Sequence, residues 1–410
     1  MEYESLFKAA RKAGTALADV EPERLGRILQ HAAMLLRGHT PALLEANARD
    51  IEAMPASSPM LDRLRLTPER IGSIASDMEA VSHLRSPQGE ELARWTRPNG
   101  MTIVKRRVPF GVVGMVCEAR PNVTADIFAL CVKTGNAVIL RGGKEAAASN
   151  RAIVKVMQTA GYAAGLPEGS LSLVEDTSRE SATALMRLNE YLDVIIPRGG
   201  AGLIRAVVEN ATVPAIETGT GNCHVYVDAS ADLEMAKAIV INAKTQRPSV
   251  CNAEEKLLVH QSAAGNFLPD MLRELEARGV EIIGDQRVCA LYPGAAPASD
   301  EDWAREYLDL KIGVKIVDSL DEAIAHINRY NSGHSEAIIT RDYAASQRFL
   351  DEIDAAAVYV NASTRFTDGF EFGFGAEIGI STQKIHARGP MGLAELTSTK
   401  YIIFGNGQIR

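Results

Sequence analysis

Residues 112–140 read VVGMVCEARPNVTADIFALCVKTGNAVIL. Two short runs of β-branched and other apolar residues, Val112–Cys117 and Ala137–Leu140, enclose a stretch of helical character, Val123–Thr134. A strand, a helix and a second strand in this order form a βαβ unit, whose two strands lie parallel in one sheet. This stretch therefore predicts an α/β fold built on a parallel sheet.

The same alternation continues toward the C-terminus. Further strands are expected at Leu171–Val174, Val194–Ile196, Val213–Ile216, His224–Val227, Lys256–His260, Val280–Ile283, Val314–Val317, Ala337–Ile339 and Ala357–Val360. Helices are expected at Glu145–Ala160, Ser178–Leu188, Leu203–Asn210, Asp232–Ala243 and Ala263–Ala277. Two doubly wound α/β domains fit this series better than one very wide sheet. We place them at residues 1–90 with 108–225, and at residues 226–380.

Composition excludes several classes of protein. The 410 residues include 44 basic and 52 acidic side chains, a formal net charge of −8, whereas a nucleic-acid binder needs a basic excess. No apolar run approaches the ~20 residues that span a bilayer, and the acidic N-terminus does not resemble a secretory signal. The five cysteines form an odd set with no close pair, which favours a reducing compartment. We expect a cytoplasmic protein that contacts neither nucleic acid nor membrane.

Cys251 is the cysteine with the clearest chemical signal. It lies in a loop between a predicted helix and a predicted strand, with Arg247 four residues and Lys244 seven residues before it. The thiolate is the nucleophilic form of cysteine, and nearby cations raise its population at neutral pH. The pattern indicates a candidate nucleophile. The alternative is a buried, inert cysteine, which is the interpretation that suits Cys117 and Cys131.

A glycine-rich turn joins a predicted strand to a predicted helix at residues 195–203, IIPRGGAGL. Glycines let the backbone approach a phosphate, and the free N–H groups of a helix N-terminus attract an anion. Gly199, Gly200 and Gly202 are therefore candidate phosphate-binding residues, and Arg198 would add a bidentate donor. A purely structural turn is the alternative.

A second such turn, residues 140–145, reads LRGGKE and places Arg141 and Lys144 at the end of a predicted strand. Open α/β sheets bind ligands at this edge. An NAD site would use an acidic residue on the ribose, whereas Arg and Lys suit a ribose 2′-phosphate. The two turns together indicate a dinucleotide site that takes NADP(H), with solvated surface cations as the alternative.

Asn122 also lies between a predicted strand and a predicted helix. Its amide could donate to a developing oxyanion, although Asn in this place is more often a helix N-cap. None of the eight histidines shows the HExxH spacing or lies near a further cysteine, so no metal site is expected.

These segments resemble the γ-glutamyl phosphate reductases, also called glutamate-5-semialdehyde dehydrogenases, of the aldehyde dehydrogenase superfamily. The resemblance follows the order of nearly the whole chain and includes the loop around Cys251. Its strings are VPFGVVG at 108–114, EARPNV at 118–123, AVILRGGKE at 137–145, ETGTGNCHVYVD at 217–228, HINRYNSGHSE at 326–336, VNASTRF at 360–366 and QKIHARGPMG at 383–392.

The resemblance implies a reaction, namely the NADPH-dependent reduction of L-glutamate 5-phosphate to L-glutamate 5-semialdehyde and phosphate in proline biosynthesis. Cys251 would attack the acyl phosphate and form a thioester, Asn122 would bind the oxyanion, and residues 198–202 would form the pyrophosphate turn. Most of the superfamily has Lys-Pro-Ala-Glu after the second strand. Here Arg141 to Lys144 replaces that string, and a cation replaces its acid, which supports NADP over NAD.

The resemblance also bears on substrate residues. Glu217 falls about where hydrolytic members keep a water-activating glutamate, but an enzyme that releases phosphate needs no activated water, so we do not expect Glu217 to be a catalytic base. Arg247 and Lys244 are candidates for the acyl-phosphate dianion. Candidates for the other polar groups of the substrate are Glu118, Arg120, Asn361 and Arg365.

The superfamily architecture implies a β-arm, here residues 91–107 and 381–410, that joins subunits into a homodimer or homotetramer. Because an acyl phosphate is labile, the implied reaction also raises the hypothesis of a transient contact with glutamate 5-kinase. Two other functions stay open. One is an aldehyde dehydrogenase or acylating reductase with another acyl acceptor, and the other is a catalytically silent dinucleotide-binding protein.

Overall fold

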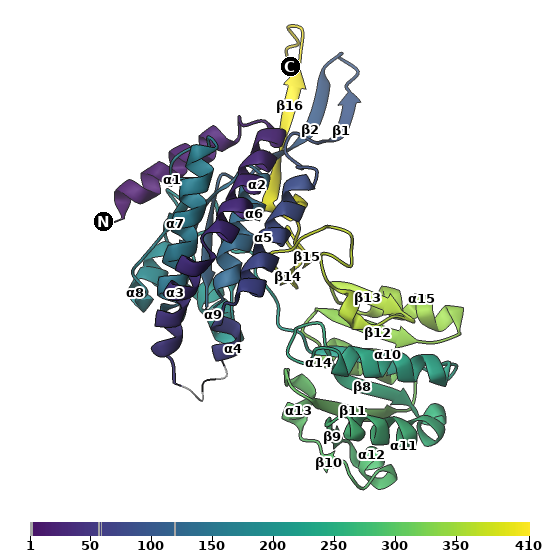
Figure 1. Cartoon of the computed structure of the whole chain (residues 1–410). Helices are drawn as coiled ribbons and strands as arrows, with labels where there is room; N and C mark the ends of the chain where they lie inside the picture. Colours follow the sequence, from purple (N-terminus) through teal and green to yellow (C-terminus); the bar gives the residue numbers. More distant parts are fainter. Residues whose placement is uncertain (1–2, 56–57, 59, 119) are drawn as a thin grey trace. The chain divides into compact units, whose positions relative to one another are not determined.

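The computed structural model describes residues 3–55, 58, 60–118 and 120–410, and the chain divides into two compact units (Figure 1). Unit 1 consists of residues 1–218, 373–379 and 391–410, and unit 2 consists of residues 219–372 and 380–390. The predicted boundary after residue 225 is therefore wrong, because it would cut the first strand of unit 2, β7 (Cys223–Val227). Residues 381–390, predicted to lie in the β-arm, belong to unit 2.

Unit 1 is built on four parallel strands in the order β5-β4-β3-β6, which confirms the α/β prediction. These strands are β3 (Val112–Cys117), β4 (Ala137–Arg141), β5 (Leu171–Leu173) and β6 (Val194–Arg198). Its helices are α1 (Glu4–Leu17), α2 (Pro22–Gly38), α3 (Thr40–Glu52), α4 (Leu61–Leu64), α5 (Pro68–His83), α6 (Pro121–Lys133), α7 (Ala147–Ala163), α8 (Arg179–Leu185) and α9 (Ala201–Asn210), with short 3₁₀ turns η1 (Lys144–Ala146) and η3 (Ala394–Leu396). The predicted strand Val213–Ile216 is wrong, since that segment forms only one isolated bridge, between Ala215 and Ile195.

A three-stranded antiparallel sheet in the order β1-β2-β16 belongs to unit 1. Its strands are β1 (Glu91–Thr96), β2 (Thr102–Pro109) and β16 (Thr397–Phe404). Residues almost 300 positions apart pair here, for example Thr397 with Pro109. Its strands come from residues 91–109 and from residues 397–404 of the predicted segment 381–410. That this sheet joins subunits stays a prediction.

Unit 2 contains seven strands in the order β10-β9-β11-β8-β7-β12-β13, and each neighbouring pair is parallel. Besides β7 they are β8 (Glu254–His260), β9 (Glu281–Gly284), β10 (Ala296–Pro297), β11 (Lys311–Val317), β12 (Ser335–Ile339) and β13 (Ala357–Val360). The helices are α10 (Leu233–Thr245), α11 (Gln261–Ala277), α12 (Gln286–Leu291), α13 (Asp300–Ala304), α14 (Leu320–Tyr330) and α15 (Tyr343–Glu352), followed by the 3₁₀ turn η2 (Thr364–Phe366) and the short pair β14 (Ile380–Ser381) and β15 (Gly389–Pro390).

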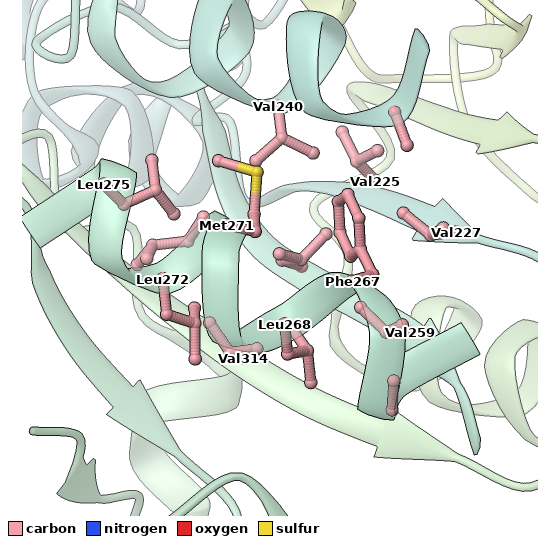
Figure 2. Close-up of a cluster of buried hydrophobic side chains, with 14 of the residues drawn as sticks. Val225, Val227, Val240, Val259, Phe267, Leu268, Met271, Leu272, Leu275 and Val314 are labelled. Carbon is pink, nitrogen blue, oxygen red and sulfur yellow. The ribbon is translucent and has the colours of Figure 1, made fainter. Parts of the chain in front are cut away.

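One hydrophobic core of unit 2 forms where α10 and α11 pack against the sheet. Figure 2 shows Phe267, Leu268 and Met271 of α11 among Val225 of β7 and Val259 of β8, all of them buried. The central strands β7, β8 and β12 are buried on both faces, as expected for a parallel sheet covered by helices, whereas the edge strand β10 is exposed. Of the helices built from the described residues, none is both long enough and apolar enough to cross a membrane.

Within unit 1, the carboxylate of Asp50 caps a helix that has no side-chain cap of its own. The N-cap of α7, Ala146, lacks a polar side chain, and Asp50 on α3 supplies the missing acceptors. Its Oδ1 accepts from the Ala148 N–H at 3.0 Å, and its Oδ2 accepts from the Ser149 N–H at 2.7 Å and from the Ser149 hydroxyl at 2.6 Å. A carboxylate is favourable at a helix N-terminus, and these hydrogen bonds from Asp50 link α3 to α7.

We predict that Asp50→Ala lowers the free energy of unfolding by about 2 kcal/mol, because it leaves buried N–H groups at the start of α7 without an acceptor. Urea denaturation followed by circular dichroism measures the loss. Glu52→Ala, an exposed carboxylate on the same helix, is the control and should change the value by less than about 0.5 kcal/mol. Equal stability of the two variants would contradict the capping role.

Candidate active site

Cys251 lies in the loop between α10 and β8 of unit 2, where its side chain is partly exposed. Its backbone carbonyl accepts a hydrogen bond from the Cys223 thiol at 3.2 Å. A Cβ atom on Gly221 would lie only 1.4 Å from the same carbonyl oxygen, so no side chain fits at position 221. The start of β7 therefore holds the candidate nucleophile loop on one side.

Residues 364–367 hold the loop on its other side through Asn252, which follows the candidate nucleophile. The Asn252 amide donates to the carbonyl oxygen of Thr367 at 2.9 Å and to that of Arg365 at 3.3 Å. The hydroxyl of Thr364 donates to the Asn252 carbonyl at 2.8 Å. The backbone around Cys251 is thus fixed by hydrogen bonds from two segments that are distant in the sequence.

Two guanidinium groups belong to the surroundings of Cys251. Arg247 is exposed, and Arg365 is partly buried and donates through its Nε to Gln246 at 2.9 Å. Burial lowers the pKa of Arg365, and the positive charge of Arg247 lowers it further, whereas the negative charges of Asp368 and Cys251 raise it. An anion bound between two guanidinium groups would offset this repulsion. Arg247 is where the sequence predicts a phosphate ligand. Arg365 was not assigned to phosphate, because a contact over more than 100 residues leaves no spacing signal.

Lys244 is a different case, since its ammonium group is fully buried and lies 3.4 Å from the carboxylate of Glu255, which is also fully buried. Burial lowers the pKa of Lys244, and the charge of Glu255 opposes that effect. This placement argues against Lys244 as a direct ligand of a substrate phosphate. Its distance of seven residues from Cys251 did not reveal that it lies on the buried face of α10.

Asn361 likewise uses its side chain within the fold. Its amide nitrogen donates to the Thr340 carbonyl at 2.9 Å, and its amide oxygen accepts from the Thr340 N–H at 2.9 Å. These two bonds connect the ends of β12 and β13, and they hold Asn361 at a positive φ of 58°. The geometry argues for a structural role of Asn361 and against a contact with substrate.

Asn122 occupies the first turn of α6 in unit 1, where Arg120 is the N-cap residue. The Asn122 amide donates to the Asp126 carboxylate at 3.1 Å. Burial raises the pKa of Asp126 to about 7, the neighbouring Asp77 raises it as well, and Asn122 and Arg198 oppose the rise. The bond to Asp126 fixes the direction of the amide and uses one of its two hydrogens. Glu217 is partly buried in the segment that leads to the unit boundary, and its role stays a prediction.

The glycine turn of unit 1 meets a carboxylate. The N–H of Gly200, the N-cap of α9, donates to Glu118 Oε2 at 2.9 Å, and a Cβ on Gly199 would lie 2.6 Å from the Glu118 Cδ. The N-terminus of α9 thus already binds an anionic group, as a dinucleotide pyrophosphate site must. A Cβ on Gly202 would meet nothing within 4 Å, so close packing does not explain that glycine. Arg198 ends β6 directly before this turn.

A shallow pocket at the ends of β4 and β5 adjoins the second predicted cofactor turn. Its lining includes Gly142, Gly143, Asn150, Arg151, Glu175 and Thr177. Arg141 is buried and donates to the carbonyl oxygens of Thr177 and Ser178, while its buried Nε has no hydrogen-bond partner. Lys144 is exposed in η1. Arg151, which pairs with Glu175 at 2.9 Å, is a cation of this pocket that the sequence did not single out, because it lies inside helix α7.

The other thiols do not resemble Cys251. Burial raises the pKa of Cys117 to about 12 and also raises the pKa of Cys131. The Cys289 thiol donates to the carbonyl of Gly284 at 3.5 Å. Gly284 ends β9, which β8 and β11 separate from β7 in the sheet. Within the described residues there is no group of three or more His, Cys, Asp or Glu side chains that could hold a metal ion.

Comparison with known proteins assigns the chain to a family. The model of the aldehyde dehydrogenase family matches residues 1–288 and 312–402. The chain is 57% identical over 410 residues to the γ-glutamyl phosphate reductase of Caldicellulosiruptor bescii, with 98% of each protein covered. It is 56% identical over 413 residues to that of Moorella thermoacetica, with 100% of this chain and 99% of the relative covered.

Solved structures give the same result. The crystal structure of the γ-glutamyl phosphate reductase from Thermotoga maritima matches with a TM-score of 0.97 and 46% identity over 100% of both chains. An acetylating aldehyde dehydrogenase from Geobacillus thermoglucosidasius, at 18% identity and a TM-score of 0.69 over 100% of this chain and 97% of that one, shares the fold. The chain therefore belongs to the aldehyde dehydrogenase family and, within it, to the γ-glutamyl phosphate reductases, which are oxidoreductases that use a nicotinamide cofactor.

Proposed function

We propose that this chain reduces L-glutamate 5-phosphate to L-glutamate 5-semialdehyde and phosphate with NADPH, the second step of proline biosynthesis. The observation that carries the proposal is the setting of Cys251, a partly exposed thiol in a loop fixed on both sides and accompanied by two guanidinium groups. A thiol nucleophile and an anion site are what an acyl-phosphate reductase needs. The proposal also agrees with the names of relatives that are 56–62% identical to this chain.

In the proposed reaction, the Cys251 thiolate attacks the carbonyl carbon of the acyl phosphate. A carbon–sulfur bond forms, the bond from that carbon to the phosphate oxygen breaks, and phosphate leaves with the electron pair. From the family resemblance we propose Asn122, whose amide keeps a second hydrogen, as the donor to the oxyanion that forms during the attack. A bound nicotinamide cofactor supplies the hydride for the thioester carbon. Collapse of the resulting thiohemiacetal anion releases the aldehyde and restores the Cys251 thiolate.

Arg247 and Arg365 are the proposed ligands of the phosphate dianion. Guanidinium groups bind phosphate through paired N–H donors, and the bond from Arg365 Nε to Gln246 fixes the plane of that group. Binding of the dianion would also relieve the repulsion between the two arginines. This arrangement replaces the predicted pair of Arg247 and Lys244.

For the cofactor, we propose that the Gly199–Gly200 turn binds the pyrophosphate in place of the Glu118 carboxylate. Arg151 lines the pocket in which the ribose 2′-phosphate would lie, Arg141 donates to the carbonyl of Thr177 on its wall, and Lys144 directly follows the lining residue Gly143. Three cations at this position favour NADP(H) over NAD(H), because a 2′-phosphate carries up to two negative charges.

The β1-β2-β16 sheet is the proposed contact between subunits. The β1-β2-β16 sheet exposes Trp95, Tyr401, Ile403 and Phe404, and its edge strands have unpaired backbone groups, so we propose that it joins subunits of a homodimer or homotetramer in the cytoplasm. The transient contact with glutamate 5-kinase stays a hypothesis that rests on the lability of the substrate.

Cys251→Ala should lower phosphate-dependent reduction of NADP⁺ by glutamate 5-semialdehyde by about 10³-fold or more, because no thioester can form. The assay follows NADPH absorbance in the presence and absence of phosphate. Cys289→Ala is the matched control and should retain wild-type turnover. Full activity of Cys251→Ala would rule out Cys251 as the nucleophile. Turnover that needs coenzyme A instead of phosphate would favour an acylating reductase.

In the same assay, the oxidation of glutamate 5-semialdehyde by NADP⁺, Arg365→Met should raise the KM for phosphate by about 10- to 100-fold. The substitution removes charge-assisted hydrogen bonds to the dianion. The KM for NADP⁺ should stay unchanged. Initial-rate kinetics at varied phosphate measure both constants. Arg278→Met, at the exposed C-cap position of α11, serves as the control. An unchanged KM for phosphate in Arg365→Met would remove Arg365 from the phosphate site.

The cofactor assignment predicts that Lys144→Ala and Arg151→Ala each raise the KM for NADPH by about 10-fold and leave the KM for NADH nearly unchanged. Only NADPH carries the 2′-phosphate that these cations would bind. Steady-state kinetics with both cofactors test this, with Lys155→Ala, an exposed lysine on α7, as the control. A loss of the same size for both cofactors would contradict the assignment.

A further inference from the structure

Cys223 is fully buried at the first position of β7, 28 residues before Cys251 in the sequence. Its thiol donates to the Cys251 carbonyl oxygen at 3.2 Å. We propose that Cys223 is a positioning residue, whose thiol fixes the peptide plane of Cys251 and thereby the direction in which the Cys251 sulfur points. This inference rests on the proposed role of Cys251 as the nucleophile.

The bond from Cys223 acts on a carbonyl that has little room to move. The Cα of Gly221 packs against the same oxygen, because a Cβ atom added to Gly221 would lie only 1.4 Å from it. The N–H of Gly221 in turn donates to the Glu306 carboxylate at 2.6 Å, which fixes the segment that precedes β7. The peptide of Cys251 is thus located by shape from Gly221 and by a directional bond from Cys223.

Cys223 is itself held by a chain of polar side chains. Its sulfur lies 3.8 Å from Nδ1 of His334, a fully buried residue directly before β12. The same nitrogen lies 2.8 Å from the hydroxyl oxygen of Ser335, and that oxygen lies 2.6 Å from the hydroxyl oxygen of Thr367. His334, Ser335 and Thr367 are all fully buried, so these contacts restrict the rotamer of Cys223.

The chain returns to the nucleophile loop. The backbone carbonyl of Thr367 accepts the 2.9 Å bond from the Asn252 amide, and Asn252 directly follows Cys251. Cys223, His334, Ser335, Thr367 and Asn252 therefore close a ring of polar contacts around the Cys251–Asn252 peptide. The phenol of Tyr359 supports the ring from outside, 2.7 Å from the Thr367 hydroxyl oxygen. The ring thereby links the group that holds the Cys251 carbonyl, Cys223, to the group that holds the Asn252 side chain, Thr367.

The charges of the ring suit this role. Burial raises the pKa of Cys223 well above its ordinary value, and the negative charges of Glu336 and Cys251 raise it further, so the thiol keeps the proton that it donates. Burial lowers the pKa of His334 to about 4, so its imidazole is neutral at pH 7. The two cysteines then have separate tasks, since a protonated Cys223 adds no charge beside the thiolate of Cys251.

The experiment compares Cys223→Ala, which removes the donor, with Cys223→Ser, which keeps one. We expect Cys223→Ala to lower kcat for phosphate-dependent NADP⁺ reduction by about 10-fold with KM values unchanged, because a misplaced nucleophile slows the chemical step and not binding. The rate of Cys251 alkylation by iodoacetamide, mapped by peptide mass spectrometry from pH 6 to 10, should fall by a similar factor. Cys223→Ser should stay within about threefold of wild type in both measurements.

Cys289→Ala is the matched control, because it removes a thiol that donates to a backbone carbonyl elsewhere in unit 2. It should change neither the kcat nor the alkylation profile. If Cys223→Ala does not fold, Ser335→Ala breaks the ring one step away and should give the same two losses. Wild-type kcat and alkylation in Cys223→Ala, or losses of equal size in Cys223→Ala and Cys223→Ser, would overturn the inference.

Alkylation uses no substrate, so it reports on positioning independently of the proposed reaction. Failure of the proposed function would appear as turnover retained by Cys251→Ala, and failure of the inference as a Cys251 alkylation rate that does not depend on the donor at position 223.

Discussion

The carbonyl group of Cys251 lies between the Cα of Gly221 and the thiol of Cys223, and the candidate active site of unit 2 depends on this contact. This contact fixes the loop backbone, while the side chain of Cys251 must stay partly exposed to react. A nucleophile on a freely moving loop would lose much of the advantage that orientation gives to an enzyme. The close approach requires glycine at position 221, and the hydrogen bond requires a donor at position 223.

The sheet of unit 2 explains why these residues meet. Cys251, Cys223 and His334 each lie at or just before the amino end of a strand, β8, β7 and β12 respectively, and these three strands are parallel and adjacent. Open α/β sheets more often bind ligands at the carboxyl ends. The candidate cofactor residues of unit 1 do lie at the carboxyl ends, in the glycine turns after β4 and β6. The two units therefore present their candidate site residues at opposite ends of their strands.

The sequence predicts well what depends on local patterns. Strand and helix periodicities differ, so β3, α6 and β4 can be recognised, and their strand–helix–strand order implies a parallel sheet. The loop cysteine and the glycine turns can be recognised from the residues next to them. Contacts across the chain leave no such signal. Lys244 has the right spacing but lies on the buried face of α10, where it pairs with Glu255. Arg365 and Cys223 join the site only through the pairing of distant segments, and Val213–Ile216 has strand composition but only one bridge partner.

The central claim is that Cys251 carries the acyl group of the substrate. The most direct test incubates the enzyme with glutamate 5-semialdehyde and NADP⁺ without phosphate, quenches with acid, and measures the peptides by mass spectrometry. We predict that the Cys251 peptide gains the mass of the glutamyl acyl group, and that added phosphate removes it. A Cys251 peptide that stays unmodified when phosphate is absent, or an acyl group on another residue, would contradict this role of Cys251.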